Sequence, residues 1–354
     1  MRKHPDTSPS FCFAFGLGLA SKNARGDYLE SYFPAPLHAL SDSLAQALRK
    51  IFTQEHQELD HRQLKTLQDL FNSAGETAQA EICRTLSRTP ATSRASVAVM
   101  LTEDTVIQSV PGAYLKLHLL SHRLVLPNSM ILEGLFAHLP TVAWTDRGAI
   151  DPAEIDQEVL AARLRGEHLV VHGLDKFPRM LDYVIPSGVR IADASRVRLG
   201  AYLGEGTTVM HEGFMNFNSA TLGPNMVEGR ISQGVVVGAH SDLGGGSSTM
   251  GTLSGGGNIT ISLGENCLIG ANAGTGIPLG DRCTIESGLY ITAGTPVRLC
   301  YETESGEIQE KLVKARELAG QSDLLFLRNG RTGQVECRTN QRAIELNKIL
   351  HAHN

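Results

Sequence analysis

Residues 185–230 read IPSGVRIADASRVRLGAYLGEGTTVMHEGFMNFNSATLGPNMVEGR, and an apolar or small residue recurs at every sixth position of this stretch. The series runs from Ile185 to Val227, restarts at Ile231 and continues to Val297. A period of six is neither the 3.6 of an amphipathic helix nor the two of a simple strand. It is typical of a parallel β-helix, in which each hexad supplies one short strand and one corner. The stacked coils then bury one continuous apolar column.

Two irregularities interrupt this period. The step from Val227 to Ile231 has four residues instead of six. Further along, the Gly-rich segments 244–248 and 255–257 flank a run with little apolar content, which predicts an excursion of the chain off a coil. Departures from a regular scaffold tend to occur at functional sites. Both places are therefore candidates for chemistry.

The composition limits the class of protein. A chain of 354 residues has room for two or three domains, and 42% hydrophobic with 19% charged residues is typical of a soluble globular protein. The formal net charge is −5 and no Lys/Arg cluster stands out, so nucleic acid is not an expected partner. The six cysteines include no CxxC pair, which predicts reduced thiols and a cytoplasmic location.

The N-terminal segment alternates large apolar residues with Cys, Ala or Gly. The large residues are Phe11, Phe13, Phe15, Leu17 and Leu19. A period of two predicts a half-buried strand. Arg2 and Lys3 leave a secretory signal open as the alternative, but the segment is too short to span a membrane, and no membrane association is expected.

The rest of the chain shows mixed helix and strand patterns. Before the repeats we expect helices with apolar faces at residues 44–52, 64–71, 114–126 and 154–164, the second opened by a capping box at Asp60 and Gln63, and strands at 97–101 and 169–171. After the repeats we expect a polar loop at 303–309, a hairpin over 324–338 and a short amphipathic helix at 342–350. The pattern predicts a mainly β chain in three parts: an α/β domain (1–180), the β-helix (181–300) and a C-terminal segment (301–354).

A β-helix alone does not define a function. Hexapeptide coils are common in acyl-CoA transferases and in one class of carbonic anhydrases, and both assemble as trimers. The anhydrase needs three His ligands for its metal. Only His211 and His240 occur in the coil region, which makes that class a poor match.

Several segments of the coil region and the C-terminal part are more specific than any single Gly-rich loop. They are MHEGFMNFN (210–218), GPNMVEGRIS (223–232), SDLGGGSSTMGTLSGGGN (241–258), CLIGANAGTGIPLGD (267–281), ESGLYITAGT (286–295) and VKAREL (313–318). The chain resembles the long form of the tetrahydrodipicolinate N-succinyltransferases, closely over these regions and more loosely over residues 1–110. The resemblance implies a left-handed coil and a homotrimer with active sites between neighbouring chains.

The reaction that the resemblance implies joins succinyl-CoA to L-2-amino-6-oxopimelate, the open form of tetrahydrodipicolinate, in lysine and diaminopimelate biosynthesis. Glu228 aligns with the residue proposed as catalytic in this family. It would act either as the general base for the amine or as a nucleophile that forms a mixed anhydride. The plainer alternative is an exposed corner residue paired with Arg230.

The resemblance also implies a binding surface for succinyl-CoA. Arg230 would bind the succinyl carboxylate or nearby acyl-CoA atoms, and a guanidinium fork suits a carboxylate. The other matched positions are Gly245, Ser248, Ala271, Glu286, Ser287, Gly294, Lys314, Leu327, Arg328, Asn329 and Gly330. Lys314 would supply a cation for phosphate. Each position could instead serve only corner geometry or solvation.

One departure from the family pattern concerns a metal. Relatives hold an ion on the trimer axis through Glu212 and an earlier Asp, and the position matching that Asp is Ser195 here. Because a hydroxyl is a weaker ligand than a carboxylate, we expect any Mg²⁺ at Glu212 to be weak or absent. No cofactor is required beyond succinyl-CoA as co-substrate. The alternatives to this function are a hexapeptide acyltransferase with another acyl-CoA or amine, and a non-catalytic trimeric scaffold.

Overall fold

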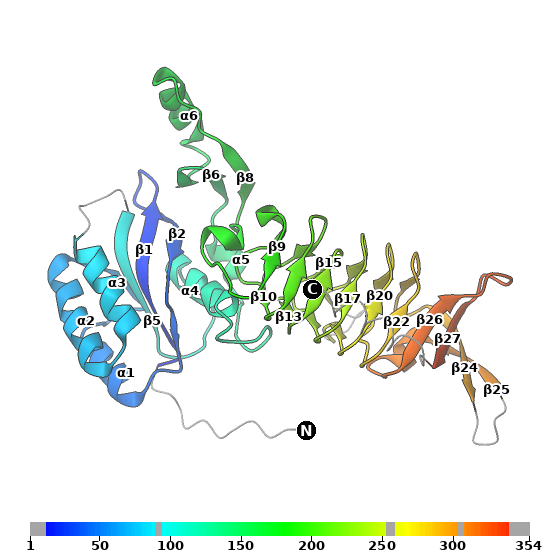
Figure 1. Cartoon of the computed structure of the whole chain (residues 1–354). Coiled ribbons are helices and arrows are strands. Elements are labelled where there is room, and N and C mark those ends of the chain that lie inside the picture. Colours follow the sequence, from blue (N-terminus) through cyan, green and yellow to red (C-terminus); the bar gives the residue numbers. More distant parts are fainter. Residues whose placement is uncertain (1–11, 89–93, 253–258, 303–307, 340–354) are drawn as a thin grey trace. The chain divides into compact units, whose positions relative to one another are not determined.

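The computed structural model describes residues 12–88, 94–252, 259–302 and 308–339. It divides the chain into two compact units (Figure 1). The first unit holds most of the chain up to residue 184, and the second holds the remainder together with residues 125–129 and 179–181. The finer division into 1–180, 181–300 and 301–354 stays a prediction.

The first unit is the expected mixed α/β region. Its main sheet is antiparallel in the order β2-β1-β5-β4, with β3 also on β1. The strands are β1 (Ala14–Lys22), β2 (Tyr28–Tyr32), β3 (Leu37–His38), β4 (His56–Glu58) and β5 (Arg94–Leu101). The helices are α1 (Asp42–Arg49), α2 (His61–Ala74), α3 (Thr77–Arg88), α4 (Val110–Ser121) and α5 (Leu135–His138). A second sheet has the order β7-β6-β8 and carries a further helix: β6 (Val142–Thr145), β7 (Gly148–Ile150), β8 (Val171–Asp175) and α6 (Ile155–Leu164).

Strand β1 is buried on both faces, so the prediction of a half-buried strand was wrong. Phe15 and Leu17 join the core that α1, α2 and α3 close. On the opposite face a Cβ at Gly16 would lie 2.9 Å from Leu115 of α4. The small residues that alternate with the large ones therefore form the face against which α4 packs. Phe11 lies outside the described residues.

The helix predictions hold in outline. The capping box of α2 is present, with Asp60 accepting from the Gln63 N–H, and α2 and α3 form a helical pair between β4 and β5. Helix α1 ends at Arg49, before the predicted apolar positions 51 and 52. Helix α4 starts earlier and ends earlier than the predicted 114–126. In the described part of the chain, no helix is both long and apolar enough to cross a membrane.

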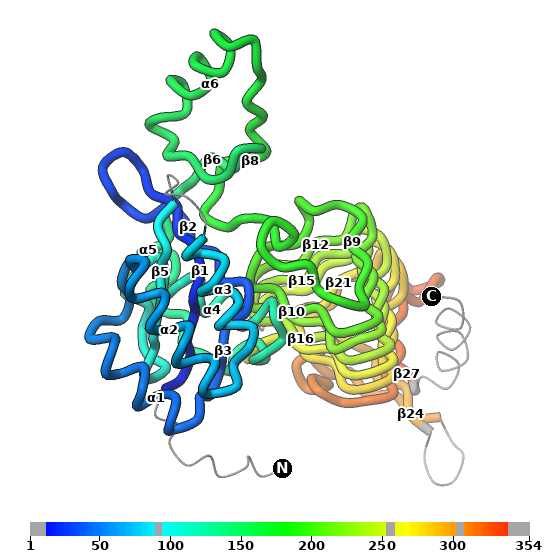
Figure 2. The backbone as a smooth tube through the Cα atoms, turned by 60° about the vertical axis from the view of Figure 1, so that its left-hand side comes forward, coloured from blue at the N-terminus to red at the C-terminus, as the bar shows by residue number. Residues whose placement is uncertain are grey.

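The second unit is a parallel β-helix with three walls, and Figure 2 shows its coils stacked one behind another. The β9 wall contains β9 (Arg190–Ile191), β11 (Thr207–Val209), β14 (Asn225–Val227), β17 (Asp242–Leu243), β20 (Leu268–Ile269), β22 (Thr284–Ile285) and β26 (Leu324–Arg328). The β12 wall contains β12 (Phe214–Met215), β15 (Arg230–Ile231), β18 (Ser248–Thr249), β21 (Gly274–Thr275) and β23 (Tyr290–Ile291). The β10 wall contains β10 (Tyr202–Leu203), β13 (Ala220–Thr221), β16 (Val236–Val237) and β19 (Ser262–Leu263).

The sixfold positions form the interior of this unit. From Val197 to Val297, each described residue of the series is at most 2% exposed. The first two members are exceptions, because Ile185 is 85% exposed and Ile191 is half-buried. The predicted start of the column at Ile185 was therefore wrong. The fully buried series begins at Val197, one step after β9 has already paired with the following coil.

Strand pairing gives the length of each coil. Val209 pairs with Val227, eighteen residues on, as three hexads require. Met215 pairs with Ile231, only sixteen residues on. The predicted four-residue step between Val227 and Ile231 is thus confirmed, and it shortens one coil by two residues.

A second short step escaped the sixfold pattern. Leu263 pairs with Leu279, sixteen residues on, so the step from Thr275 to Leu279 also has four residues. One coil earlier, Val237 pairs with Leu263 and Thr249 pairs with Thr275, each twenty-six residues on. The extra residues of this coil lie after Thr249, which places the chain excursion there. The excursion shifts the register by two and the second short step shifts it back. Residues 244–247, expected to flank the excursion, instead form an ordinary corner between β17 and β18.

The C-terminal part extends the β9 wall with two antiparallel strand pairs. The predicted hairpin over 324–338 is confirmed as β26 and β27 (Val335–Thr339). The predicted polar loop at 303–309 was wrong at its end, because β24 (Pro296–Glu302) pairs with β25 (Ile308–Lys314). Alternation along the β24–β25 pair, with Val297 opposite Val313, replaces the sixfold period there. The helix predicted at 342–350 lies outside the described residues.

We expect the sixfold column to dominate the stability of the second unit. Replacing Ile231, which is fully buried, with Ala should cost about 2–5 kcal/mol because it removes apolar contacts and leaves a cavity. The matched change Ile308→Ala, at a strand position that is 75% exposed, should change stability by less than about 0.5 kcal/mol. Thermal unfolding of the full chain compares the two variants. A larger loss at Ile308 than at Ile231 would contradict the assignment of the column.

Candidate active site on one edge of the β-helix

The turns that lead from the β9 wall to the β12 wall stack along one edge of the β-helix, which we name the Glu228 edge. It consists of residues 192–196, 210–213, 228–229, 244–247, 270–273 and 286–289. Residues 327–330 form the end of β26 and the start of the turn after it, and they come next to the last of these turns. Five of the predicted binding or catalytic positions lie in these turns, namely Glu228, Gly245, Ala271, Glu286 and Ser287, together with the predicted metal ligand Glu212.

Hydrogen bonds between coils hold these positions in a row. The Asn272 N–H donates to the Gly245 carbonyl at 2.8 Å, and the Gly288 N–H donates to the Ala271 carbonyl at 2.8 Å. The Arg328 N–H donates to Glu286 Oε2 at 2.7 Å. Residues that are far apart in sequence, from Gly245 to Arg328, therefore line one continuous strip of surface.

Glu228 occupies the shortest of these turns. Only Glu228 and Gly229 separate β14 from β15, whereas the next coil uses four residues for the same corner. The Glu228 side chain is half-buried. Within the described residues, its carboxylate has neither a hydrogen bond nor an ion pair, and Arg230 does not pair with it. The two-residue turn presents a carboxylate whose oxygens are available to an outside molecule.

Glycines make room for this carboxylate. A Cβ at Gly229 would lie 2.1 Å from Ser247 Oγ and 2.7 Å from the Ser247 carbonyl oxygen, so the short turn rests directly on the following coil. A Cβ at Gly245 would meet only Glu228 Oε2, at 3.6 Å. The carboxylate therefore lies over Gly245, beside space that no other protein atom fills within 4 Å of that point.

A second row runs beside the first on the β12 wall. Arg230 of β15 pairs with Ser248 of β18, and the same row continues to Gly274 and Tyr290. Arg230 is exposed and Ser248 is half-buried. A Cβ at Gly274 would lie 2.2 Å from the Tyr290 ring, so this ring covers the glycine. The guanidinium, the hydroxyl and the phenol thus follow one another along the wall next to Glu228.

Two predicted residues lie elsewhere in the second unit. Gly294 belongs to the turn after β23, and Lys314 ends β25. They are near each other, because the Ala315 N–H donates to the Thr295 carbonyl at 2.9 Å. Lys314 is exposed, and its N–H donates to Glu317 Oε1 at 2.9 Å. The structure groups this pair at the C-terminal end of the coils and not on the Glu228 edge.

Residues 327–330 are held by the polar network of the hairpin. Asn329 Nδ2 donates to Glu336 Oε1 at 2.6 Å, while the Asn329 side-chain oxygen accepts from the Arg331 N–H at 2.9 Å. The amide of Asn329 and then the Arg338 guanidinium lower the pKa of Glu336, which stays ionised and keeps the turn in place. Gly330 is exposed, as is Arg328, which also donates to the Gly333 carbonyl at 3.0 Å.

The surroundings of Glu212 do not fit a metal ion in the single chain. Its carboxylate pairs with Arg196 at 3.2 Å and with His211 at 3.2 Å. Ser195 Oγ donates to Asp193 Oδ1 at 2.7 Å, and this bond is the main cause of the lowered pKa of Asp193. The residues that the structure describes include no group of three His, Cys, Asp or Glu side chains that could hold an ion. A weak or absent Mg²⁺ at Glu212 stays a prediction.

Sequence reasoning missed two residues of these rows. Asn272 lies on the Glu228 edge, where its side-chain oxygen would be 2.5 Å from a Cβ at Gly246. Its backbone is left-handed, with φ of 55°, as are those of Asn218 and Asn266 at other corners. Asn at a hexad corner is the signal that could have identified it, since Asn tolerates this conformation. Tyr290 gave no comparable signal. Its ring lies where a side chain at Gly274, one coil away, would otherwise be.

The contact between Gly229 and Ser247 predicts unequal effects of one substitution at two facing turns. Gly229→Ala should force the short turn off the next coil and destabilise the protein by about 1–3 kcal/mol. Gly245→Ala is the matched control, because its new methyl group finds open space and should leave stability nearly unchanged. Thermal or urea unfolding measures both. Equal stability of the two variants would show that the short turn does not rest on the following coil.

Three family descriptions match parts of the chain. Residues 36–137 match the tetrahydrodipicolinate N-succinyltransferase N-terminal model, residues 139–179 the middle model, and residues 260–293 the hexapeptide repeat of succinyl-transferase. With these repeats the coil is the left-handed parallel β-helix that the resemblance implied.

Similar proteins extend the match to nearly the whole chain. A 2,3,4,5-tetrahydropyridine-2,6-dicarboxylate N-succinyltransferase of Pseudomonas putida is 56% identical over 97% of this chain and 98% of its own length. The protein of the same name from Vibrio cholerae is 53% identical over 97% of this chain and 99% of its own. A crystal structure of a putative 2,3,4,5-tetrahydropyridine-2-carboxylate N-succinyltransferase from Campylobacter jejuni has a TM-score of 0.85 at 30% identity. The match covers 96% of this chain and 95% of the Campylobacter jejuni chain. The chain belongs to the tetrahydrodipicolinate N-succinyltransferase family.

Proposed function

We propose that this chain transfers the succinyl group of succinyl-CoA to the amino group of L-2-amino-6-oxopimelate, the open form of tetrahydrodipicolinate. The product serves lysine and diaminopimelate biosynthesis. The observation that carries the proposal is the Glu228 carboxylate, which has no protein partner among the described residues and lies over Gly245 on the Glu228 edge. Relatives named N-succinyltransferases at 53–56% identity favour the succinyl donor over another acyl group or a scaffold role.

Glu228 acts in this proposal as the general base. The amine nitrogen attacks the thioester carbonyl carbon and forms the C–N bond, and a proton of the amine passes to the Glu228 carboxylate. The C–S bond then breaks, and its electron pair leaves with CoA as the thiolate, which takes up a proton. A positioned base of this kind contributes about 10²–10⁴-fold to a rate. The anhydride route is the alternative: the carboxylate would displace the CoA thiolate first, and the amine would then attack the anhydride and release the carboxylate.

The strip of small residues beside Glu228 suits an extended acyl-CoA. Gly245 carries no side chain there, and Ala271, Ser287 and Gly288 are exposed in the next two turns. Glycine and alanine let a ligand approach the backbone closely. We propose that the pantetheine arm follows this strip from Glu228 towards residues 327–330, where the exposed Arg328 offers a cation.

In this proposal Arg230 and Ser248 recognise the acyl end of succinyl-CoA. Arg230 is the first residue after the Glu228–Gly229 turn, and Ser248 pairs with it on the next coil. An exposed guanidinium can hold the free carboxylate of a succinyl group through two parallel hydrogen bonds. Gly294 and Lys314 are grouped at the C-terminal end of the coils. In this proposal they contact the phosphates of CoA.

The proposed assembly is a homotrimer with active sites between neighbouring chains, in the cytoplasm. The openness of the Glu228 edge supports a site that a second chain completes: the single chain leaves Arg230, Ala271 and Ser287 exposed. Six free cysteines support a reducing compartment.

The substitution Glu228→Gln tests the assignment, because it keeps the shape of the side chain and removes its charge and basicity. We expect kcat for succinyl transfer to fall by about 10²–10⁴-fold with little change in melting temperature. Glu265→Gln, at an exposed corner of the same β-helix, is the matched control and should keep full activity. The readout is thiol release from succinyl-CoA in the presence of tetrahydrodipicolinate. Near-normal turnover by Glu228→Gln would exclude this carboxylate as the base.

A further inference from the structure

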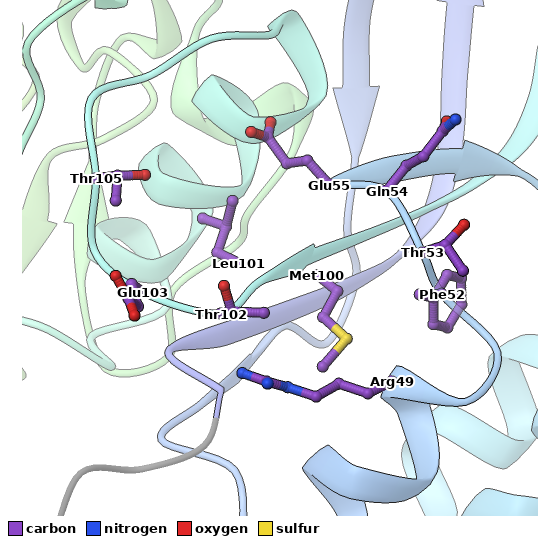
Figure 3. A pocket seen from close by; sticks show the side chains of 10 residues that line it. All are labelled: Arg49, Phe52, Thr53, Gln54, Glu55, Met100, Leu101, Thr102, Glu103 and Thr105. Atoms are coloured by element: carbon purple, nitrogen blue, oxygen red, sulfur yellow. The ribbon is translucent and has the colours of Figure 1, made fainter.

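The first unit contains a pocket that none of the chemistry above uses. It lies between the end of α1, residues 52–55 and residues 100–105 at the end of β5 (Figure 3). Its volume is about 270 Å³. Since a water molecule takes ~30 Å³ of liquid, the pocket holds a molecule of roughly nine non-hydrogen atoms. A free amino acid has this size, whereas a nucleotide or CoA is much larger.

Hydrogen bonds hold the walls of this pocket in place. The buried Lys116 Nζ donates to Asp104 Oδ1 at 2.6 Å and to the Thr105 carbonyl at 2.6 Å, which fixes the segment after β5. On the other side, the Met100 N–H donates to the Glu55 carbonyl at 2.7 Å, and Ser109 Oγ donates to the Glu55 carboxylate. The pocket is therefore formed before a ligand arrives, as small-molecule sites usually are.

The lining combines an apolar floor with charges of both signs. Phe52, Met100 and Leu101 are buried and supply the apolar surface. Arg49 is the single cation of the lining, and Glu55 and Glu103 are its two anions. Figure 3 shows the two carboxylates apart from each other, with the guanidinium of Arg49 on another side.

These charges define the complementary ligand. A guanidinium has five N–H donors, so Arg49 can bind a ligand carboxylate alongside a protein partner. Two separated carboxylates match two separated ammonium groups. An inorganic anion would face a net negative lining, and a purely apolar molecule would offer no polar contact to the charged side chains of the lining. An aliphatic chain between the ammonium groups would lie on the floor of Phe52 and Met100.

We propose that this pocket binds a free basic α-amino acid, with one carboxylate, two ammonium groups and an unbranched aliphatic chain. Arg49 takes the carboxylate, and Glu55 and Glu103 take the ammonium groups. The site lies in the first unit and involves no residue of the Glu228 edge. It does not rest on the proposed succinyl transfer.

Isothermal titration of the full chain with L-lysine tests the site. We expect one binding site per chain, and Arg49→Met should weaken binding at least tenfold because it removes a charge-assisted contact to the carboxylate. The matched control Lys50→Met removes the neighbouring exposed cation, which does not line the pocket, and should bind as the wild type does. L-norleucine, which lacks the second ammonium group, should bind at least tenfold more weakly than L-lysine.

A second variant keeps the test independent of the folding of Arg49→Met. Glu103 is exposed, and Glu103→Gln should also weaken L-lysine binding while the melting temperature stays unchanged. Glu228→Gln should bind L-lysine normally, which separates this pocket from the Glu228 edge. No heat of binding at millimolar L-lysine would overturn the proposal. Equal affinity of the wild type, Arg49→Met and Glu103→Gln would overturn it as well.

Discussion

The structure depends on the stacking of parallel coils around one apolar column. Each strand is hydrogen-bonded to the equivalent strand of the next coil, and each inward residue packs on the residue above it. Because pairing fixes the walls, a missing pair of residues cannot be spread over the coil and must shorten one corner. The corner shortened at Glu228 and Gly229 is therefore a local event in a rigid frame. A frame of this kind can hold a functional side chain within the small tolerance that catalysis needs.

Much of this frame follows from sequence because a period of six differs from the 3.6 of a helix and the two of a strand. The sixfold residues from Val197 onward, the short step after Val227 and the β26–β27 hairpin were all predictable from spacing and turn residues. The features that were not predicted depend on contacts between segments that are distant in the sequence. The second short step at Thr275 was hidden because the excursion after Thr249 shifts the register by the opposite amount. The burial of β1 on both faces depends on α4, nearly a hundred residues away.

The candidate site also combines residues that the sequence predicts with residues that only the folded chain brings together. Glu228 could be singled out because the irregular step and the family motif coincide there. The alignment of Gly245, Ala271 and Ser287 beneath it is a property of coil stacking, and sequence alone placed them only as separate matches. Asn272 and Tyr290 join these rows through glycines in adjacent coils, a relation that no local pattern reports. The pocket at Arg49 likewise combines α1 with the end of β5, which tertiary packing alone brings together.

The most direct test lengthens the corner at Glu228 to the regular size. Two residues, Gly-Ser, inserted after Gly229 would turn the four-residue step into six, and regular corners elsewhere in the β-helix show that the frame accepts this length. The same insertion at the second short step, between Thr275 and Leu279, is the control. The quantity measured is kcat for succinyl transfer in folded protein. A loss of at least about 100-fold at Glu228, with activity retained in the control, is the predicted result. Full activity after the insertion at Glu228 would show that the short corner does not position the carboxylate that we propose as catalytic.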